Sequence, residues 1–277
     1  MTAFVIFNPS SAGGATGRDW REIEEALERV FPLMSFFVTT APGQAAHMVR
    51  DALHDGHLEI IAVGGDGTIN EALNGFFQNG RPVAPDAVYN FVHNGHDSVL
   101  CRRFGLQPGW RAGVAHLSQA RIHKTDLGRV SCLSADGAPL TRYFLGEASF
   151  GLSASIARSL GRARIARLFG HAFATSLHGF WAQVRWRGTR VRLMADNYDE
   201  IAGIASVSVA PARGLLDLRF LDGAGRADET RSLHTLRLTA APTLDTATAV
   251  NVECDGESAG ILPASFDVYP AAINLRI

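Results

Sequence analysis

The chain of 277 residues is 47% hydrophobic and 19% charged, with a net charge of −1. This is an ordinary globular composition, long enough for one large domain or for two. A net charge near zero excludes a chain-wide attraction to nucleic acid or membrane, so any basic surface has to be local. The three cysteines, Cys101, Cys132 and Cys254, lack metal-ligand spacing and favour a reducing compartment.

Strand and helix patterns alternate through the first part of the chain. Apolar runs and helical spacing predict strand 3–7, helix 20–31, strand 33–39, helix 43–54, strand 58–63, helix 68–77 and strand 87–92. Such alternation is typical of a parallel sheet, so we expect an α/β domain over residues 1–122.

The second part of the chain is β-rich. Its apolar segments are 125–132, 141–145, 190–194, 204–209, 215–221, 250–254 and 265–269. They predict a sandwich-like domain over residues 123–277, with a helical insert near 153–183. Between Glu147 and Asp196 arginines mix with apolar and tryptophan residues and no acid occurs. This basic insert suits an anionic membrane surface, with a solvated helix face as the alternative.

The turn after strand 58–63 is the most informative feature of the chain. Residues 64–68 read Gly-Gly-Asp-Gly-Thr and lead into a helix. Glycines let the backbone approach a ligand closely, and the free N–H groups at a helix start favour an anion. We therefore predict a phosphate-binding turn, in which Asp66 orients a phosphoryl group or holds a metal ion.

The octapeptide at residues 64–71, GGDGTINE, resembles the nucleotide-binding signature of the diacylglycerol kinase catalytic family. That family includes bacterial lipid kinases, sphingosine kinases and ceramide kinases, with NAD kinases and phosphofructokinases as distant relatives. The resemblance implies an NAD-kinase- or phosphofructokinase-like first domain. It also implies nucleotide contacts from Gly64, Gly65, Gly67, Thr68, Asn70 and Glu71.

Two loops at the ends of earlier strands fit the same resemblance. Asn8 opens the loop at residues 8–14, which is similar to the family's Asn-Pro loop bordering the nucleotide phosphates. Backbone N–H groups and a side-chain amide suit that role. Thr39 and Thr40 end the second strand, where the family places a threonine near the nucleotide. For Thr40 we expect a nucleotide contact, with a helix N-cap as the alternative.

Carboxylates near the C-terminus resemble the family's catalytic element. Asp255 and Glu257 lie in Asp-Gly-Glu, and the resemblance implies that Glu257, or Asp255, accepts the proton of the lipid hydroxyl that attacks the γ-phosphate. A β-hairpin turn is the alternative for Asp-Gly. Asp126 fits another family acid that supports the site, or else a solvated strand end.

Two places depart from the family pattern. Arg213 stands where bacterial diacylglycerol kinases carry an aspartate bound to a structural Mg²⁺, and a cation cannot ligate a cation. His96 stands at the threonine of the family's Gly-Thr-x-Asn-Asp loop, with Ser98 and Val99 at its Asn and Asp; we retain His96 as a nucleotide contact. We expect no metal ion fixed by the protein itself, with Asp66 reaching the Mg²⁺ that the nucleotide brings.

The family resemblance implies a lipid kinase that uses ATP and Mg²⁺ to phosphorylate a hydroxyl of a diacylglycerol-, ceramide- or sphingoid-type lipid. The alternatives are a pseudokinase that binds nucleotide or lipid without turnover, and a kinase of a soluble hydroxyl substrate. No nucleic-acid module accompanies the arginines, so we expect no nucleic-acid partner. The acceptor lipid, the nucleotide preference and the oligomeric state are not indicated by the sequence.

The expected location is cytoplasmic, peripheral at the inner face of the membrane. The first residues show neither the basic stretch nor the cleavage site of a signal peptide. No apolar run reaches the roughly 20 residues needed to span a bilayer. Membrane contact is therefore expected at the surface only, through the basic insert.

Overall fold

The structure, a computed structural model, describes residues 2–95, 98–151, 189–196, 198–204, 206–221, 227–243 and 249–277. The chain divides into two compact units. Unit 1 contains Met1–Leu127 and Pro270–Ile277, and unit 2 contains Gly128–Tyr269. His96 and the predicted insert near 153–183 lie outside the described residues.

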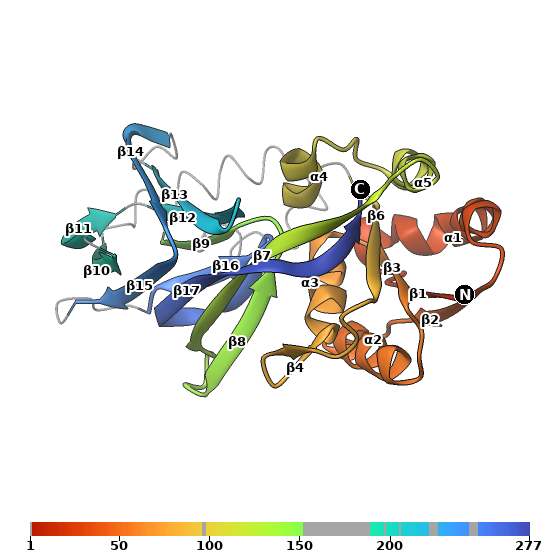
Figure 1. Ribbon diagram of the computed structural model, residues 1–277, viewed down its shortest axis with the longest axis horizontal. Coiled ribbons are helices and arrows are strands. Elements are labelled where there is room, and N and C mark those ends of the chain that lie inside the picture. The colour runs from red at the N-terminus through yellow and green to blue at the C-terminus, as the bar shows by residue number, and fades with distance from the viewer. Residues whose placement is uncertain are drawn as a thin grey trace. The chain divides into compact units, whose positions relative to one another are not determined.

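Unit 1 is built on a parallel sheet (Figure 1). Its strand order is β2 (Met34–Val38), β1 (Ala3–Phe7), β3 (Glu59–Gly64) and β6 (Val88–His93), and the end of β17 (Glu257–Arg276) pairs with β6. The chain runs from β1 outward to β2 and then returns to β3 on the other side of β1. This reversal is a topological switch point, and ligands of open α/β sheets bind beyond the carboxyl ends of the strands there.

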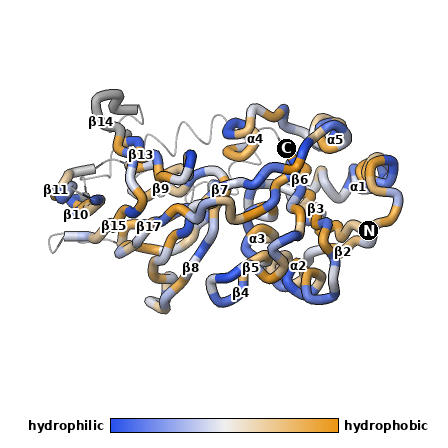
Figure 2. Tube along the Cα trace, viewed as in Figure 1, coloured by the Kyte–Doolittle hydropathy of each residue, from blue (hydrophilic) through white to orange (hydrophobic). Residues whose placement is uncertain are grey.

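Helices cover both faces of this sheet. The described part of unit 1 has α1 (Ser11–Val30), α2 (Gln44–His54), α3 (Asp66–Gly75), α4 (Val99–Phe104) and α5 (Trp110–Leu117), with a short hairpin of β4 (Phe77–Gln78) and β5 (Arg81–Pro82). Side chains alternate along a strand, so Val5 and Phe7 point to one face and join Ile23 of α1 and Val114 of α5 in one buried cluster. In Figure 2 hydrophilic and hydrophobic residues alternate around α1, as its one-sided burial requires.

Unit 2 is an antiparallel β structure. Its strands are β7 (Ile122–Leu133), which continues from unit 1, β8 (Pro139–Phe144), β9 (Ala148–Gly151), β10 (Thr189–Ala195), β11 (Tyr198–Ile204), β12 (Ser206–Ala212), β13 (Leu215–Leu221), β14 (Ala227–Thr235), β15 (Arg237–Pro242), β16 (Asn251–Cys254) and most of β17. One group follows the order β14-β13-β12-β9-β16-β17, and β17 also pairs with β15, which pairs with β10.

The six strands of this order and the two strands β15 and β10 contribute to a single core. Val207 of β12, Phe150 of β9, Leu193 of β10 and Leu238 of β15 belong to one buried cluster, and Phe150 stacks on Phe266 with ring centroids 5.5 Å apart. Two layers of strands that share an apolar interior are typical of a β-sandwich.

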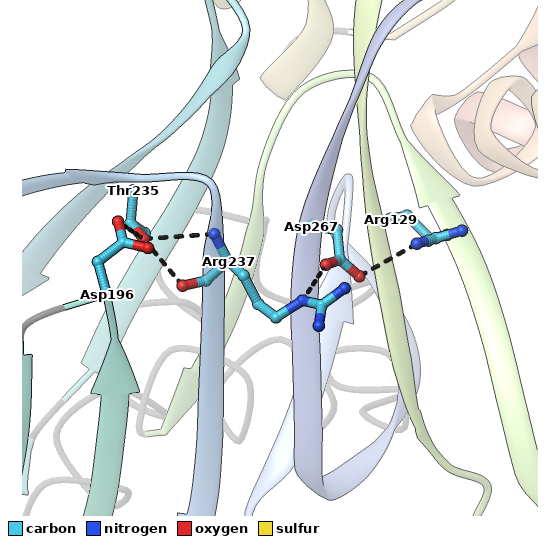
Figure 3. A network of polar contacts seen from close by, with 5 residues as sticks. All are labelled: Arg129, Asp196, Thr235, Arg237 and Asp267. Atoms are coloured by element: carbon cyan, nitrogen blue, oxygen red, sulfur yellow. Dashed lines mark hydrogen bonds and ion pairs between the residues drawn. The ribbon is translucent and has the colours of Figure 1, made fainter.

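A polar network connects three strands of unit 2 (Figure 3). Asp267 of β17 accepts a hydrogen bond from Arg237 Nε of β15 at 2.5 Å and another from Arg129 Nη2 of β7 at 3.3 Å. Next to it, the Thr235 hydroxyl donates to Asp196 at 2.6 Å. Asp267 thus holds β7 and β15 to the same strand.

Among the described residues no helix is long and apolar enough to cross a bilayer.

Candidate active site

Loops that follow three neighbouring parallel strands are bonded to one another in unit 1. The Asn8 side-chain amide donates to Thr68 Oγ1 at 3.1 Å, which connects the ends of β1 and β3. The backbone N–H of Asn94, just after β6, donates to the carbonyl of Gly64 at 2.8 Å. The structure therefore brings together two predicted nucleotide contacts, Asn8 and Thr68, at the switch point of the sheet.

Two residues that the sequence analysis missed hold the loop at residues 8–14. Thr16 is fully buried, and its hydroxyl accepts a hydrogen bond from the Asn94 amide at 3.1 Å and contacts Ser11 Oγ at 2.6 Å. Between Ser11 and Thr16 the backbone takes left-handed φ values, from 52° at Ala12 to 85° at Gly14. The short polar stretch after the first strand could have indicated a role for Thr16. Its bonding partner Asn94 could not be found in this way, because it is 78 residues away in the sequence.

Gly64 and Gly65 are glycine for different reasons. A Cβ added at Gly64 would lie 2.9 Å from Thr68 Cβ, so packing excludes a side chain there. Gly65 has ordinary extended backbone (φ −86°, ψ 176°), and a Cβ there would meet nothing within 4 Å. The first N–H groups of α3 have no carbonyl partner within the helix. Open space beside Gly65 therefore faces the end of a helix that attracts anions.

Asp66 connects this turn to the start of α4. Its carboxylate accepts hydrogen bonds from Ser98 Oγ at 2.5 Å and from the Val99 N–H at 2.8 Å, and His93 Nε2 lies 3.7 Å away. Ser98 also caps α4, because its Oγ accepts from the Cys101 N–H. Burial raises the pKa of Asp66, while the two donors and His93 oppose that shift.

Three other predicted nucleotide contacts, Thr40, Asn70 and Glu71, lie in helices α2 and α3 or form hydrogen bonds to the start of α2. The N–H and hydroxyl of Thr40 both donate to Gln44 Oε1, at 2.7 and 3.2 Å, at the start of α2. Glu71 accepts from the Ala45 N–H at 2.7 Å, also in the first turn of α2. Asn70 is buried within α3. These contacts stabilise α2 and α3, and a nucleotide contact from any of the three stays a prediction, as it does for Gly67 in the first turn of α3.

Asp255 lies in a two-residue hairpin turn of unit 2. Cys254 pairs with Glu257, and Asp255 and Gly256 between them have φ values of 49° and 83°. The fully buried Asp255 carboxylate accepts three backbone N–H bonds of 2.7 to 3.0 Å from residues 145–147. Glu257 is exposed at the start of β17. Asp255 is therefore a fixed anchor, and Glu257 is the accessible carboxylate of the pair.

Further polar residues, which the sequence analysis missed, form a row across three strands of unit 2. Ser208 pairs with Ser149, and Ser149 pairs with Glu253, which is 6% exposed. At one end Glu147 accepts from Ser208 Oγ at 2.8 Å. Each member of the row is flanked in sequence by two apolar residues, as Ser149 is by Ala148 and Phe150. That alternation was the signal for a polar sheet face.

Arg213, which stands where bacterial diacylglycerol kinases carry a magnesium-binding aspartate, lies in a tight turn. Ala212 pairs with Leu215, and Arg213 and Gly214 between them have φ values of 51° and 79°, with Arg213 exposed. Asp126 accepts from the Ala271 N–H at 2.8 Å within unit 1. Across the part of the chain that the structure describes, no group of three or more His, Cys, Asp or Glu side chains is placed to hold a metal ion.

The candidate residues thus fall into two sets. Asn8, Asp66 and Thr68 belong to unit 1, whereas Asp255 and Glu257 belong to unit 2. The meeting of the two sets around one phosphate stays a prediction.

Comparison with known families bears on the first set. Residues 2–130, which include the loop at 8–14 and the turn at 64–68, match the family model of the diacylglycerol kinase catalytic domain. In this part the chain is similar to the diacylglycerol kinase catalytic family. The resemblance seen in GGDGTINE is therefore confirmed.

Curated relatives match further residues of the chain. A diacylglycerol kinase of Staphylococcus haemolyticus (strain JCSC1435) is 26% identical over 195 residues, which are 70% of this chain and 54% of that protein. The chain spans about half the length of the curated relatives it matches.

Solved structures bear on the fold. A diacylglycerol kinase from Bacillus anthracis str. Sterne covers 99% of this chain and 96% of its own, with a TM-score of 0.67 and 15% identity. The structure of yeast NADH kinase complexed with NADH covers 100% of this chain and 82% of its own chain, with a TM-score of 0.53 and 11% identity. The prediction of an NAD-kinase-like α/β domain followed by a β-rich domain is confirmed.

Proposed function

We propose that this chain is a lipid kinase, which transfers the γ-phosphate of ATP to the hydroxyl of a diacylglycerol-, ceramide- or sphingoid-type lipid. The observation that carries the proposal is the glycine at residue 65. Neither its backbone conformation nor its neighbours exclude a side chain, yet the space beside it adjoins the start of α3. A phosphate approaching that helix end explains why the residue is glycine. The family match of residues 2–130 supports the same reading.

In this proposal unit 1 holds the nucleotide. The backbone at Gly65 and the first turn of α3 donate to the phosphates, and the Asn8 amide keeps the Thr68 hydroxyl oriented. Asp66 fixes α4 to the turn through Ser98 and Val99. A carboxylate has about four lone-pair sites, so Asp66 keeps capacity for the Mg²⁺ that accompanies ATP. That Mg²⁺ would neutralise charge on the phosphoryl group.

Unit 2 supplies the proton acceptor in this proposal. The exposed Glu257 carboxylate takes the proton of the lipid hydroxyl as the new O–P bond forms and the bond to the leaving ADP breaks. Asp255 acts as a positioning residue, because its oxygens already accept three backbone N–H groups. The hairpin that it holds ends at Glu257.

A second candidate is nucleotide or lipid binding without turnover. Arg213, exposed in a tight hairpin, favours this candidate, because a cation replaces the aspartate of the bacterial magnesium site. A kinase that relies on the Mg²⁺ of the nucleotide alone would not need that aspartate. The two candidates differ in whether ADP and a phosphorylated lipid are formed.

The deciding experiment incubates the protein with labelled ATP, Mg²⁺ and mixed vesicles that contain diacylglycerol, ceramide or sphingosine, with glycerol as a soluble acceptor. We expect label in one of the lipids and its loss in Glu257→Gln. Label in glycerol alone would favour a soluble substrate. Neither labelled product nor ADP, together with measurable ATP binding, would replace the kinase proposal by the binding protein.

We also propose peripheral association with an anionic membrane surface. Its support is the run of arginines between Glu147 and Asp196, most of which lies outside the described residues. Sedimentation with vesicles tests it: binding to phosphatidylglycerol vesicles should fall as salt rises, because exposed charges are screened. Equal binding to neutral vesicles would contradict an electrostatic contact.

A further inference from the structure

The parallel sheet of unit 1 ends in an open edge at β2. In the part of the chain that the structure describes, this strand pairs only with β1 (Figure 1). The Ala3 N–H donates to the Leu33 carbonyl at 2.8 Å, and the Thr39 N–H donates to the Phe7 carbonyl at 2.9 Å. The odd-numbered residues from 33 to 39 therefore direct their backbone groups toward β1.

The even-numbered residues of β2 direct their backbone groups the other way. Successive residues of a strand present their N–H and C=O groups to opposite edges. The outward groups thus belong to Met34, Phe36 and Val38, and no described strand lies in register with them on that side. This edge is ready to accept one more strand.

The strand lacks the features that normally protect an edge. Natural sheets block their edge strands with charged residues or proline, because unpaired backbone groups invite pairing with another chain. Strands β8, β11 and β14 also have a single described partner, and each carries charge, for example Arg142, Glu200 and Asp228. β2 reads Met-Ser-Phe-Phe-Val, and no Asp, Glu, Lys or Arg occurs between Arg29 and Arg50.

Phe36 adds an apolar contact at the same edge. It is 47% exposed, and its ring lies against Trp20 and Phe7, with centroids 5.3 and 6.2 Å away. Aromatic residues are enriched at protein interfaces, and a ring that its neighbours already hold loses little freedom on binding. Phe36 is therefore suited to anchor a partner strand.

We propose that the outer edge of β2 pairs with the same edge of a second copy of this chain. In an antiparallel pair with a two-fold axis at Phe36, this residue lies opposite the partner's Phe36, and Met34 lies opposite the partner's Val38. Every outward residue then exchanges both of its backbone hydrogen bonds with the partner. Such a two-fold pair closes on itself, so it forms a dimer and no fibre.

The absence of charge favours a second copy over a different protein. In a self-pair a charged residue at the centre would face its own copy, and like charges directly opposite each other are destabilising. A different partner would be selected by opposite charges, which this edge does not carry. The inference does not rest on the proposed kinase function, because β1 separates β2 from β3 and the turn at 64–68.

Sedimentation velocity of the full chain over a range of protein concentrations tests the proposal. We expect a reversible equilibrium between monomer and dimer. Phe36→Lys and Phe36→Asp each place like charges opposite each other and should weaken association at least about tenfold. An equal mixture of the two variants should associate again, because opposite charges then meet. Ile201→Lys, at a 50% exposed position on the edge strand β11, should leave the dimer unchanged.

Hydrogen exchange distinguishes a second copy from other occupants of the edge. Exchange of the Met34, Phe36 and Val38 N–H groups should slow as the protein concentration rises. The Phe37 N–H, which faces β1, should exchange at a rate that does not depend on concentration. Protection of the outward N–H groups at every concentration would mean that the chain covers this edge itself, and the proposal would be wrong.

Two further results would overturn the proposal. One is a monomer at every concentration, and the other is a dimer that Phe36→Lys leaves intact. If the Phe36 variants fail to fold, the concentration dependence of exchange in the unchanged protein still decides the matter. A dimer that phosphorylates no lipid would leave this inference standing while the kinase proposal fails, and a monomeric kinase would do the reverse.

Discussion

The Asn8 amide donates to the Thr68 hydroxyl at 3.1 Å, across the two loops that end β1 and β3. The strands are direct parallel neighbours, with Phe7 opposite Val63, so their carboxyl ends lie at the same edge of the sheet. A bond between the two loops fixes the turn at residues 64–68, the proposed phosphate site, before any ligand arrives. Preorganisation of this kind lowers the cost of ordering the site on binding.

A double-mutant cycle tests this bond. Asn8→Ala and Thr68→Val each remove one partner, and valine keeps the shape of threonine. We expect a coupling of about 1 kcal/mol in the free energy of unfolding, measured by urea denaturation. ATP affinity should fall in each single variant. Strictly additive effects on unfolding would show that the bond contributes nothing.

Alanine at the two adjacent glycines should have opposite consequences. Gly64→Ala places a Cβ 2.9 Å from Thr68 Cβ and should cost about 1 to 3 kcal/mol of stability through overpacking. Gly65→Ala meets no neighbour, so stability should stay within about 0.5 kcal/mol. We nevertheless expect Gly65→Ala to weaken ATP binding at least tenfold, by calorimetry. Unchanged ATP affinity in Gly65→Ala would remove the main support for a phosphate site at this turn.

The two carboxylates of the hairpin should separate into an anchor and a base. Asp255→Asn puts an amide N–H group against backbone donors and should lower the free energy of unfolding by about 3 kcal/mol. Exposed Glu257→Gln should leave the melting temperature unchanged and lower the rate of lipid phosphorylation about 100-fold or more. Full activity in Glu257→Gln would rule it out as the proton acceptor.

Asp66 should make stability depend on pH. Burial raises its pKa above the usual 3.8, so the carboxylate form is the less favourable one in the folded state. The stability of the unchanged protein relative to Asp66→Asn should therefore be highest below pH 3.8 and fall as pH rises through the raised pKa. Urea denaturation at a series of pH values measures this difference. A rise with pH instead would mean that Ser98, Val99 and His93 outweigh burial.

Ser98→Ala should loosen α4. The hydroxyl caps the helix and donates to Asp66, so its removal should cost about 1 to 2 kcal/mol of stability. Ser118→Ala, which removes an exposed hydroxyl near the end of α5, is the matched control and should cost less than about 0.5 kcal/mol. Hydrogen exchange of the Cys101 N–H reports on the cap directly. Equal costs for the two variants would contradict the capping role.

Much of the fold follows from local patterns in the sequence. The strand at 3–7 and the helix at 43–54 were predicted within a residue of β1 and α2, and the segment 215–221 coincides with β13. Apolar side chains at a spacing of two or 3.6 specify a strand or helix face wherever that face is buried. Short elements escaped this reasoning: α4 has six residues and β9 has four, too few to show a period.

The candidate site was predictable only in part. The glycine turn and Asp-Gly-Glu carry their signals within a few consecutive residues. The partner of each side chain does not: Ser98 is 32 residues from Asp66, and Leu145 is 110 residues from Asp255. The C-terminal end of β17 joins the first unit through its pairing with β6, which no pattern near residue 270 indicates.

By itself, then, the sequence determined where strands, helices and glycine-rich turns lie, because those depend on neighbours a few residues apart. Only the tertiary structure decided that Asp66 holds α4 and that Asp255 is a buried anchor. These roles depend on hydrogen bonds and burial between distant segments, and such contacts exist only once the sheets have brought the segments together.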